Sequence, residues 1–376
     1  MKIGEICVVN EERLVRTFLE LLQQESPSLD EFPMGKWLSS HLSQRGFKVT
    51  MDDAGNRIGG NCGNIVAFRA GVPGREPICF SAHLDQIQPC RGIKPVIDGD
   101  LIRTDGTTTL GGDDKAGVAA IIEAVEHILE ENQEHPDLYL LFTVCEEQGL
   151  QGSKNFDTGM LPARNMVIID AAGPAGILAY KAPAMRHIEM KFYGRKAHAG
   201  IEPEKGINAI MVAAQSIARM NTGRIDFETT VNLGKIEGGL ATNIVPDEVT
   251  VIAEVRSHSM KKLEEQTDHM MQCCELISEQ YRSRYRFVSD ISYPAFELSK
   301  ESTIYQTCLQ AFQRAGIEPQ PIITGGGSDA NILSSKGYHC AIISVGMDQV
   351  HTVDETINIR DMYKTTVALT HMLRVD

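Results

Sequence analysis

The sequence has no hydrophobic run long enough to cross a bilayer, and its start lacks the apolar segment of a signal peptide. We therefore expect neither a membrane span nor an export signal. CxxC pairs are also absent. The nine cysteines are scattered without regular spacing, which favours free thiols in a reducing cytoplasm over a disulfide framework. Basic residues are in the minority, and the formal net charge of −14 argues against nucleic acid or an anionic membrane as partner.

Nucleotide-binding signatures are missing as well. No GxGxxG opens the first strand–helix turn, and neither "LGGDDKAG" nor "TGGGSDAN" carries the GK[ST] of a phosphate loop. An enzyme that uses NAD or ATP is therefore a weak alternative. What the sequence does have is an ordinary globular composition, 42% hydrophobic and 23% charged, in 376 residues that suffice for two domains.

Helix and strand patterns alternate in the first part of the chain. Apolar residues recur at helical spacing from Leu14 to Leu22, across 32–46 and across 113–131. Four other segments have the apolar character of strands, namely "GNIVAFRAG", "PICFSAHLD", "LYLLFTV" and "NMVIIDAAG". This alternation predicts an α/β domain with a central, mostly parallel sheet flanked by helices.

A different pattern follows. Half-exposed strands such as "RHIEMKFYGR" and "EVTVIAEVRSH" combine with two helices in the order β-α-β-β-α-β, and the second helix covers 260–281. This order predicts a smaller α+β domain with a four-stranded antiparallel sheet and two helices. We therefore expect a catalytic domain formed by residues 1–178 and 295–376, with the small domain inserted at 179–294.

Acidic and imidazole groups gather at the ends of the predicted strands. Active sites of open α/β sheets lie at the carboxyl ends of strands. Each group alone has a structural alternative, since an Asp at a helix start is usually an N-cap. Several buried carboxylates at one edge, however, repel one another unless cations lie among them. The groups are His83 and Asp85, Asp113 and Asp114, Glu146 and Glu147, Asp170, and His351.

The set "HLD … GGDDKAG … EEQG … D … H" resembles the di-zinc peptidases of the M20 family, most closely the peptidase T (tripeptide aminopeptidase) branch. The resemblance covers nearly the whole chain, and the small domain is similar to the lid of that family. It implies two zinc ions per subunit, with Co²⁺ or Mn²⁺ as possible substitutes. His83, Asp113 and Asp170 would hold one ion. Asp113, Glu147 and His351 would hold the other, so that Asp113 bridges the two.

The same resemblance implies the catalytic roles. Glu146 would be the general base that moves protons between water and the leaving amine. Asp85 would accept the second imidazole N–H of His83 and fix its tautomer. In the small domain, His198 of "GRKAHAG" would donate to the substrate carbonyl oxygen. The peptide bond between Asp113 and Asp114 is often cis in this family.

Substrate contacts are expected from the small domain and from one loop. Arg256 could grip a substrate carboxylate, Asn243 could also contact substrate, and Gly326 of "TGGGSDAN" would let the backbone approach a ligand closely. The expected partner is a short peptide, acted on by a monomer or by a homodimer formed through the lid.

The activity that fits best is removal of the N-terminal residue from a tripeptide-like substrate. "EEQGLQGS" departs from the peptidase T pattern after its two glutamates, so other functions stay open. One is another M20-type amide hydrolase, such as a dipeptidase, carboxypeptidase, aminoacylase or deacylase. Another is a metal-binding homologue without catalysis.

Overall fold

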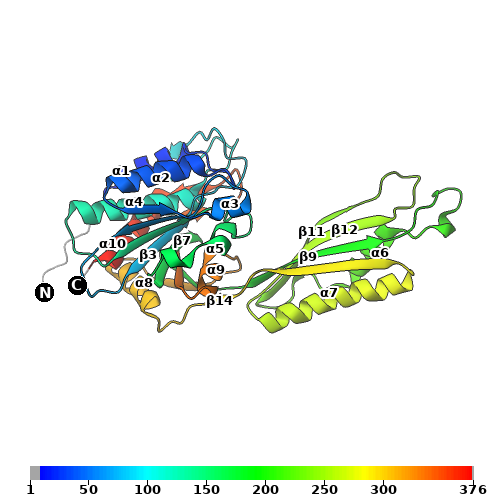
Figure 1. The fold of residues 1–376 in the computed structure, drawn as a ribbon. Coiled ribbons are helices and arrows are strands. Elements are labelled where there is room, and N and C mark those ends of the chain that lie inside the picture. Colours follow the sequence, from blue (N-terminus) through cyan, green and yellow to red (C-terminus); the bar gives the residue numbers. More distant parts are fainter. Residues whose placement is uncertain (1–8, 375–376) are drawn as a thin grey trace. The chain divides into compact units, whose positions relative to one another are not determined.

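The protein, seen in a computed structural model that describes residues 9–374, divides into two units (Figure 1). Unit 2 is inserted in unit 1, as expected for the small domain. The sequence prediction placed this small domain at residues 179–294. The loop Gly325–Gly327, predicted to belong to the catalytic domain, groups with unit 2. Unit 1 runs up to Tyr180 and continues over Glu297–Thr324 and from Ser328, and unit 2 comprises Lys181–Phe296 and Gly325–Gly327.

The large sheet has a parallel core of four strands in the order β6, β3, β7, β16. These strands span Leu138–Thr143, Ile78–His83, Asn165–Ala172 and His339–Asp348. Shorter strands extend the sheet on both sides, with β2 antiparallel to β6 and β17 antiparallel to β16. They are β1 (Lys48–Met51), β2 (Ile65–Arg69), β4 (Val96–Asp98), β5 (Leu101–Arg103), β8 (Ile177–Ala182), β14 (Phe296–Glu297), β15 (Gln320–Ile323) and β17 (Thr356–Asn358).

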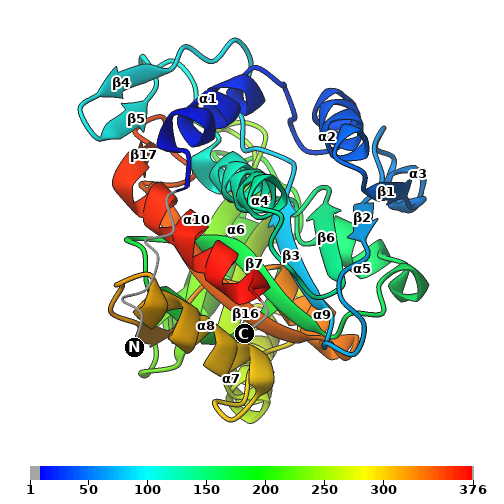
Figure 2. The same cartoon turned by 90° about the vertical axis from the view of Figure 1, so that its left-hand side faces the viewer.

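Helices pack against this sheet. Figure 2 shows α4, α10 and α8 in front of the strands, and α10 contacts both of the other two. Helix α4 also contacts β3 and β7, with α1 packed against it. The helices are α1 (Glu11–Leu22), α2 (Phe32–Gln44), α3 (Ala54–Ile58), α4 (Gly112–Glu130), α5 (Gln151–Asn155), α8 (Thr303–Arg314), α9 (Asp329–Ser335), α10 (Ile359–Leu373) and the 3₁₀ turn η1 (Thr158–Met160).

Local sequence explains where these elements begin. The side chain of Asn10 accepts a hydrogen bond from the Arg13 N–H at the start of α1, and Asn358 does the same for Asp361 in α10. Strand β6 is buried along most of its length, as expected for a central strand with both faces covered. The predicted fold class of the large domain is therefore confirmed.

Unit 2 is an antiparallel sheet with two helices, as predicted. The sheet has one strand more than the four expected, because the two-residue β10 adds to β11. Helices α6 (Ala209–Arg219) and α7 (Met260–Gln280) pack on strands β9 and β12. The strands are β9 (Ala184–Tyr193), β10 (Gly223–Arg224), β11 (Thr229–Gly238), β12 (Glu248–Ser257) and β13 (Arg284–Tyr293), and a 3₁₀ turn η2 covers Pro203–Lys205.

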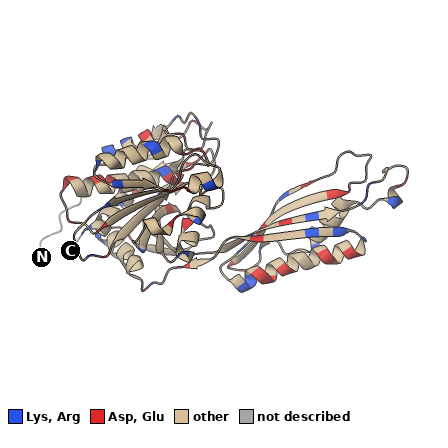
Figure 3. Cartoon of the chain, in the orientation of Figure 1, with Lys and Arg blue, Asp and Glu red and all other residues tan. Residues whose placement is uncertain are grey.

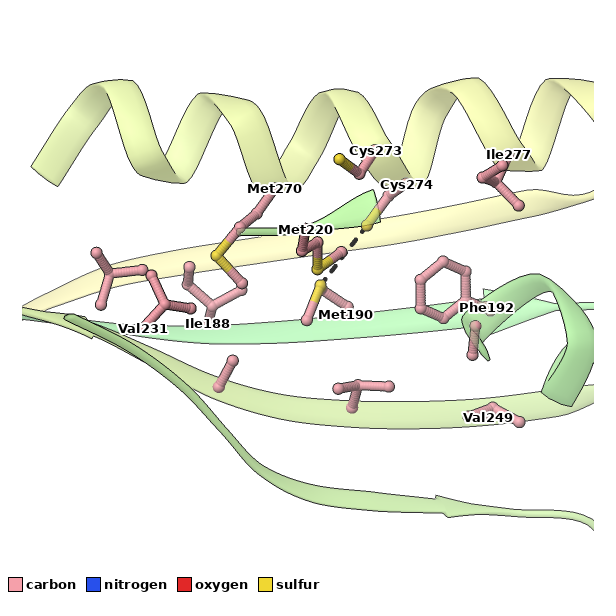
Figure 4. Packing of buried hydrophobic residues seen from close by; sticks show 14 of the residues in the cluster. Ile188, Met190, Phe192, Met220, Val231, Val249, Met270, Cys273, Cys274 and Ile277 are labelled. Atoms are coloured by element: carbon pink, nitrogen blue, oxygen red, sulfur yellow. Dashed lines mark hydrogen bonds between the residues drawn. The ribbon is translucent and has the colours of Figure 1, made fainter. Parts of the chain in front are cut away.

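The core of unit 2 is apolar and rich in sulfur. Alternate residues of β9, including Met190 and Phe192, point toward α7 (Figure 4). The thiol of Cys274 on α7 lies 3.6 Å from the sulfur of Met190. Period-two alternation in the strand and helical spacing in α7 thus meet in one buried cluster.

Two absences among residues 9–374 bear on the sequence predictions. None of the described helices has the length and apolar character needed to span a membrane. The eight described cysteines are buried and free of disulfides, and the ninth, Cys7, lies outside the described residues.

Candidate metal centre

The predicted site residues of unit 1 stand where the parallel strands end. His83 is the last residue of β3, and Asp170 lies near the end of β7. Glu147 follows β6 and His351 follows β16. Because the four strands run in the same direction, their carboxyl ends meet at one edge of the sheet. Asp113 joins them from the beginning of α4.

The structure brings these five side chains together. Nε2 of His83 lies 2.8 Å from Oδ1 of Asp113 and 3.7 Å from Oδ1 of Asp170. Nε2 of His351 lies 3.2 Å from Oδ2 of Asp113 and 3.1 Å from Oε2 of Glu147. The two oxygens of Asp113 therefore face two different imidazoles, as a bridging carboxylate requires.

Asp114 lies beside this cluster. Ligand atoms of His83, Asp113 and Glu147 all lie within 4.8 Å of one another, and so do those of His83, Asp114 and Asp170. The carboxylate of Asp114 already accepts two main-chain N–H groups, from His83 and from Gly117, each at 3.2 Å. This engagement favours Asp113 as the shared ligand. The peptide bond between the two aspartates is cis, as the family resemblance implied.

The electrostatics of the cluster call for positive charge. Burial, together with the negative charge of Asp170, raises the pKa of Glu146 well above its usual range. Burial and Asp113 raise the pKa of Asp170 in the same way. Hydrogen bonds with Asp113 and Glu147 raise the pKa of His351 to about 10. In the absence of a metal cation, bound protons therefore have to offset the repulsion between these carboxylates.

One buried oxygen in the cluster has no protein partner. Oε1 of Glu147 lacks a hydrogen bond, although an unpaired buried carboxylate oxygen is costly. Carboxylate oxygens and imidazole nitrogens at these separations are the donors that zinc and related divalent ions take. The residues present therefore fit a pair of divalent cations.

Asp85 is fully buried behind the cluster. Its Oδ1 accepts the N–H of Glu146 at 2.8 Å, and its Oδ2 accepts the N–H of Glu147 at 3.2 Å and the hydroxyl of Ser28 at 2.7 Å. Nδ1 of His83 lies 3.0 Å from the main-chain oxygen of Asp85 and 3.4 Å from its carboxylate. The Asp85 carboxylate thus holds the backbone of the two glutamates more closely than it holds the imidazole.

The remaining predicted residues lie in unit 2. His198 is exposed, and its Nδ1 accepts the N–H of Gly200 at 3.2 Å. An isolated bridge pairs His198 with Ile244, and beside it the Asn243 carbonyl accepts the N–H of Ala199, the residue after His198, at 3.0 Å. The structure thus brings His198 and Asn243 together.

Arg256 has a partner that the sequence did not suggest. Its guanidinium donates to both carboxylate oxygens of Glu254, at 2.9 and 3.1 Å. A third bond, 3.4 Å long, goes to the carbonyl of Gly325, next to Gly326. Arg256 and the glycine-rich loop are therefore neighbours.

Sequence reasoning missed several buried carboxylates of unit 1, among them Asp329 and Glu355. Asp329, at the first turn of α9, accepts the hydroxyl of Thr143 from β6, and its Oδ1 has no partner. Glu355 accepts three main-chain N–H groups near Asp113. Neither follows a strand end directly, so the rule that found the other acidic residues passes over both. The available signals were the glycine-rich stretch "TGGGSDAN" that contains Asp329 and the position of Glu355 four residues after His351.

Comparisons with known proteins identify the family and the fold of the chain. Residues 184–282 match the family model "Peptidase dimerisation domain" (M20_dimer), and residues 64–199 match "Peptidase family M28". The chain is 30% identical to peptidase T of Aliivibrio salmonicida, over 84% of this chain and 78% of that protein. Two crystal structures align over 97% of this chain and 98% of theirs. They are aminopeptidase PepT from Bacillus cereus, 35% identical with a TM-score of 0.90, and a tripeptidase from Staphylococcus aureus, 33% identical with a TM-score of 0.94.

Proposed function

The chain belongs to the M20 family of metallopeptidases, in the peptidase T-like branch, and we propose that it removes the N-terminal residue from tripeptide-like substrates. Metal-dependent peptide hydrolysis is the activity of this branch. The tripeptide specificity and the residue roles below are our proposal. The observation that carries it is the position of Asp113, whose Oδ1 faces His83 and whose Oδ2 faces His351.

Two zinc ions are the proposed cofactors. His83, Asp113 and Asp170 would hold one ion, and Asp113, Glu147 and His351 the other. Zinc, when bound, supplies Lewis acidity that lowers the pKa of a coordinated water to about 7. Three ligand carboxylates and one hydroxide balance the four positive charges of two such ions. This count leaves Glu146 outside the ligand set.

Glu146 is then the proton carrier. Its carboxylate accepts a proton from the attacking water while the water oxygen bonds to the amide carbon. When the C–N bond breaks, the same carboxyl group gives this proton to the leaving amine. Asp85 holds Glu146 in place through the main-chain N–H.

Unit 2 supplies the substrate contacts in this proposal. His198 would donate a hydrogen bond to the carbonyl oxygen as negative charge develops there. Arg256 would bind the substrate carboxylate, with Asn243 and Gly326 as further contacts. Glu254 occupies the Nε–Nη2 edge of the Arg256 guanidinium, so a substrate carboxylate would have to bind at the Nη1–Nη2 edge or displace Glu254.

A homodimer through unit 2 completes the proposal. The dimerisation-domain match lies wholly within this unit. Unit 2 also exposes large apolar side chains, among them Ile236 on β11 (54% exposed) and Leu240 (77%). Such side chains suit an interface better than they suit water.

The test is hydrolysis of a peptide panel together with one pair of variants. Purified protein is given tripeptides, the same tripeptides with an acetylated N-terminus, dipeptides and N-acyl amino acids, with and without chelator. We expect release of the N-terminal residue from free tripeptides only, and loss of activity with chelator. Cleavage of N-acyl amino acids or dipeptides instead would identify a different M20 amide hydrolase, and full activity in metal-free protein would contradict the mechanism.

The variant pair separates the two adjacent glutamates. Glu146→Gln is expected to keep both metal ions and to lower turnover by about 10²- to 10⁴-fold, the usual value of general acid–base catalysis. Glu147→Gln, its matched control, is expected to lose metal as well. Metal content is measured by atomic emission alongside the rate. If Glu146→Gln loses metal and Glu147→Gln retains it, the two roles are reversed.

A further inference from the structure

Three main-chain N–H groups at the start of α4 point at a single carboxylate, that of Glu355. Oε2 of Glu355 accepts the N–H of Leu110 and of Gly111, each at 2.8 Å, and Oε1 accepts the N–H of Asp113 at 2.9 Å. The side chain is buried, with 2% of its surface exposed. Hydrogen bonds to a charged acceptor are roughly twice as strong as neutral ones. This carboxylate therefore holds the turn from Leu110 to Asp113 firmly.

Glu355 also stands close in sequence to another proposed ligand. It follows His351 by four residues and directly precedes β17, although 242 residues separate it from Asp113. The turn and this segment fit tightly. A Cβ on Gly112 would lie 2.6 Å from Cδ1 of Ile357 and 3.0 Å from Oε1 of Glu355, so a larger residue at 112 would force the Ile357 side chain to move. The contact thus ties the segment that bears Asp113 to the one that bears His351.

We propose that Glu355 is a positioning residue, which fixes the main chain of Asp113 relative to His351 and thereby sets the affinity of the site for the cation that they share. This rests on the proposed function, because it takes both residues as ligands. A shared carboxylate serves two ions only if both of its oxygens are correctly placed. A displacement of the Asp113 main chain moves both carboxylate oxygens with it, and functional sites tolerate displacements of only about 0.5 Å. Residues that support metal ligands in this way typically contribute 10- to 100-fold to metal affinity.

The test compares zinc binding in the parent protein, Glu355→Gln and Glu123→Gln. The glutamine at 355 keeps the shape of the side chain. One of its two terminal oxygens is replaced by an NH₂ group, which cannot accept a hydrogen bond. If this group takes the place of Oε1, the bond from the Asp113 N–H is lost. If it takes the place of Oε2, the bonds from Leu110 and Gly111 are lost. We expect at least one zinc equivalent to bind 10- to 100-fold more weakly, measured by competition with a chromophoric chelator.

Glu123→Gln is the matched control. Glu123 lies on α4, is also fully buried, and accepts the N–H of Asn10 and two N–H groups of Arg13. Its replacement removes a buried carboxylate of the same helix without touching the Leu110–Asp113 turn. We expect a lower melting temperature with zinc affinity within twofold of the parent. If Glu355→Gln also binds both zinc equivalents within twofold of the parent, Glu355 has a purely structural role and the proposal is wrong.

A second measurement needs no variant and covers the case in which Glu355→Gln does not fold. In the metal-free parent, residue-resolved hydrogen exchange is expected to show the amides of Leu110, Gly111 and Asp113 exchanging at least about 100-fold more slowly than in an unstructured peptide. Exchange at the unstructured rate would overturn the proposal.

Failure of this inference differs from failure of the proposed function. If the parent binds no zinc, the function proposed above is wrong and this inference falls with it. If the parent binds two equivalents and Glu355→Gln binds them equally well, only the role of Glu355 is wrong.

Discussion

The two units of this chain bury different kinds of side chain. Among residues 9–374, the buried polar residues of unit 2 are all uncharged, and they are Ser216, Thr229, Ser257, Gln266, Thr267 and Ser278. Its charges lie at the surface, for example on the outer side of α7 (Figure 3). Unit 1 buries a set of ionisable groups that includes Glu31, His83, Asp85, Asp114, Lys115, Glu123, Asp329 and Glu355.

The difference in buried charge predicts which unit depends on ions for its stability. Burying an ionised group costs several kcal/mol unless hydrogen bonds or opposite charges compensate. Unit 2 avoids this cost, and its stability rests on the apolar cluster around Met190 and Phe192. Under the proposed function, unit 1 accepts the cost at the edge of its sheet because the cluster there would hold cations. We therefore expect metal and protons to change the stability of unit 1 and to leave unit 2 nearly unchanged.

Metal removal is the strongest way to test this contrast. Chelation is expected to reduce hydrolysis to the background rate. It also removes the stabilisation of unit 1 by bound ions, about 4 kcal/mol at a free metal concentration a thousand times the Kd. Hydrogen exchange followed peptide by peptide, with and without zinc, would show protection lost in unit 1 only. Equal losses of protection in both units would contradict the expectation that metal stabilises unit 1 alone.

A pair of core substitutions, one in each unit, tests whether zinc binding depends on unit 1 alone. Phe142 on β6 and Phe192 on β9 are both completely buried, one in each unit. Each change to Ala is expected to cost about 3–5 kcal/mol of unfolding free energy. Only Phe142→Ala should also weaken zinc binding, because β6 leads directly to Glu146 and Glu147. Chemical denaturation and zinc titration measure the two effects. Weaker zinc binding in Phe192→Ala would show that the units are not independent in this respect.

A smaller effect is expected from pH in unit 1. Burial, together with the charge of Arg45, lowers the pKa of His41 to about 4 from its ordinary value of 6.5. As pH falls from about 6.5 to 4, the unfolded chain gains a proton there before the folded chain does, so stability is lost through this window. At about 1.4 kcal/mol per pKa unit, the contribution of His41 to the loss between pH 7 and pH 5 is about 2 kcal/mol.

The matched variant is His41→Gln, studied in chelator so that metal release does not contribute. It should lose about 2 kcal/mol less stability than the parent between these two pH values. Urea unfolding can be followed by the fluorescence of Trp37, the single tryptophan, whose ring stacks on His41 with centroids 4.7 Å apart. If both proteins lose the same unfolding free energy between pH 7 and pH 5, His41 does not contribute to this loss.

Much of the fold follows from local pattern. Helical periodicity predicted a helix over 113–131 and another over 260–281, and the structure has Gly112–Glu130 and Met260–Gln280. Short elements such as β10 and the β4–β5 pair escaped, because two or three residues show no period. Such strands form only because a neighbouring strand offers hydrogen-bond partners.

The sequence by itself determined which residues stand at the strand ends, and the rule for parallel sheets was enough to predict that His83, Glu147 and His351 converge. Only the tertiary structure decided how their atoms meet. It turned the Asp85 carboxylate toward main-chain N–H groups and brought Glu355 to Asp113 across 242 residues. The physical reason is that periodicity fixes the face on which a side chain lies. Its hydrogen-bond partner is fixed by the packing of segments that are distant in the chain.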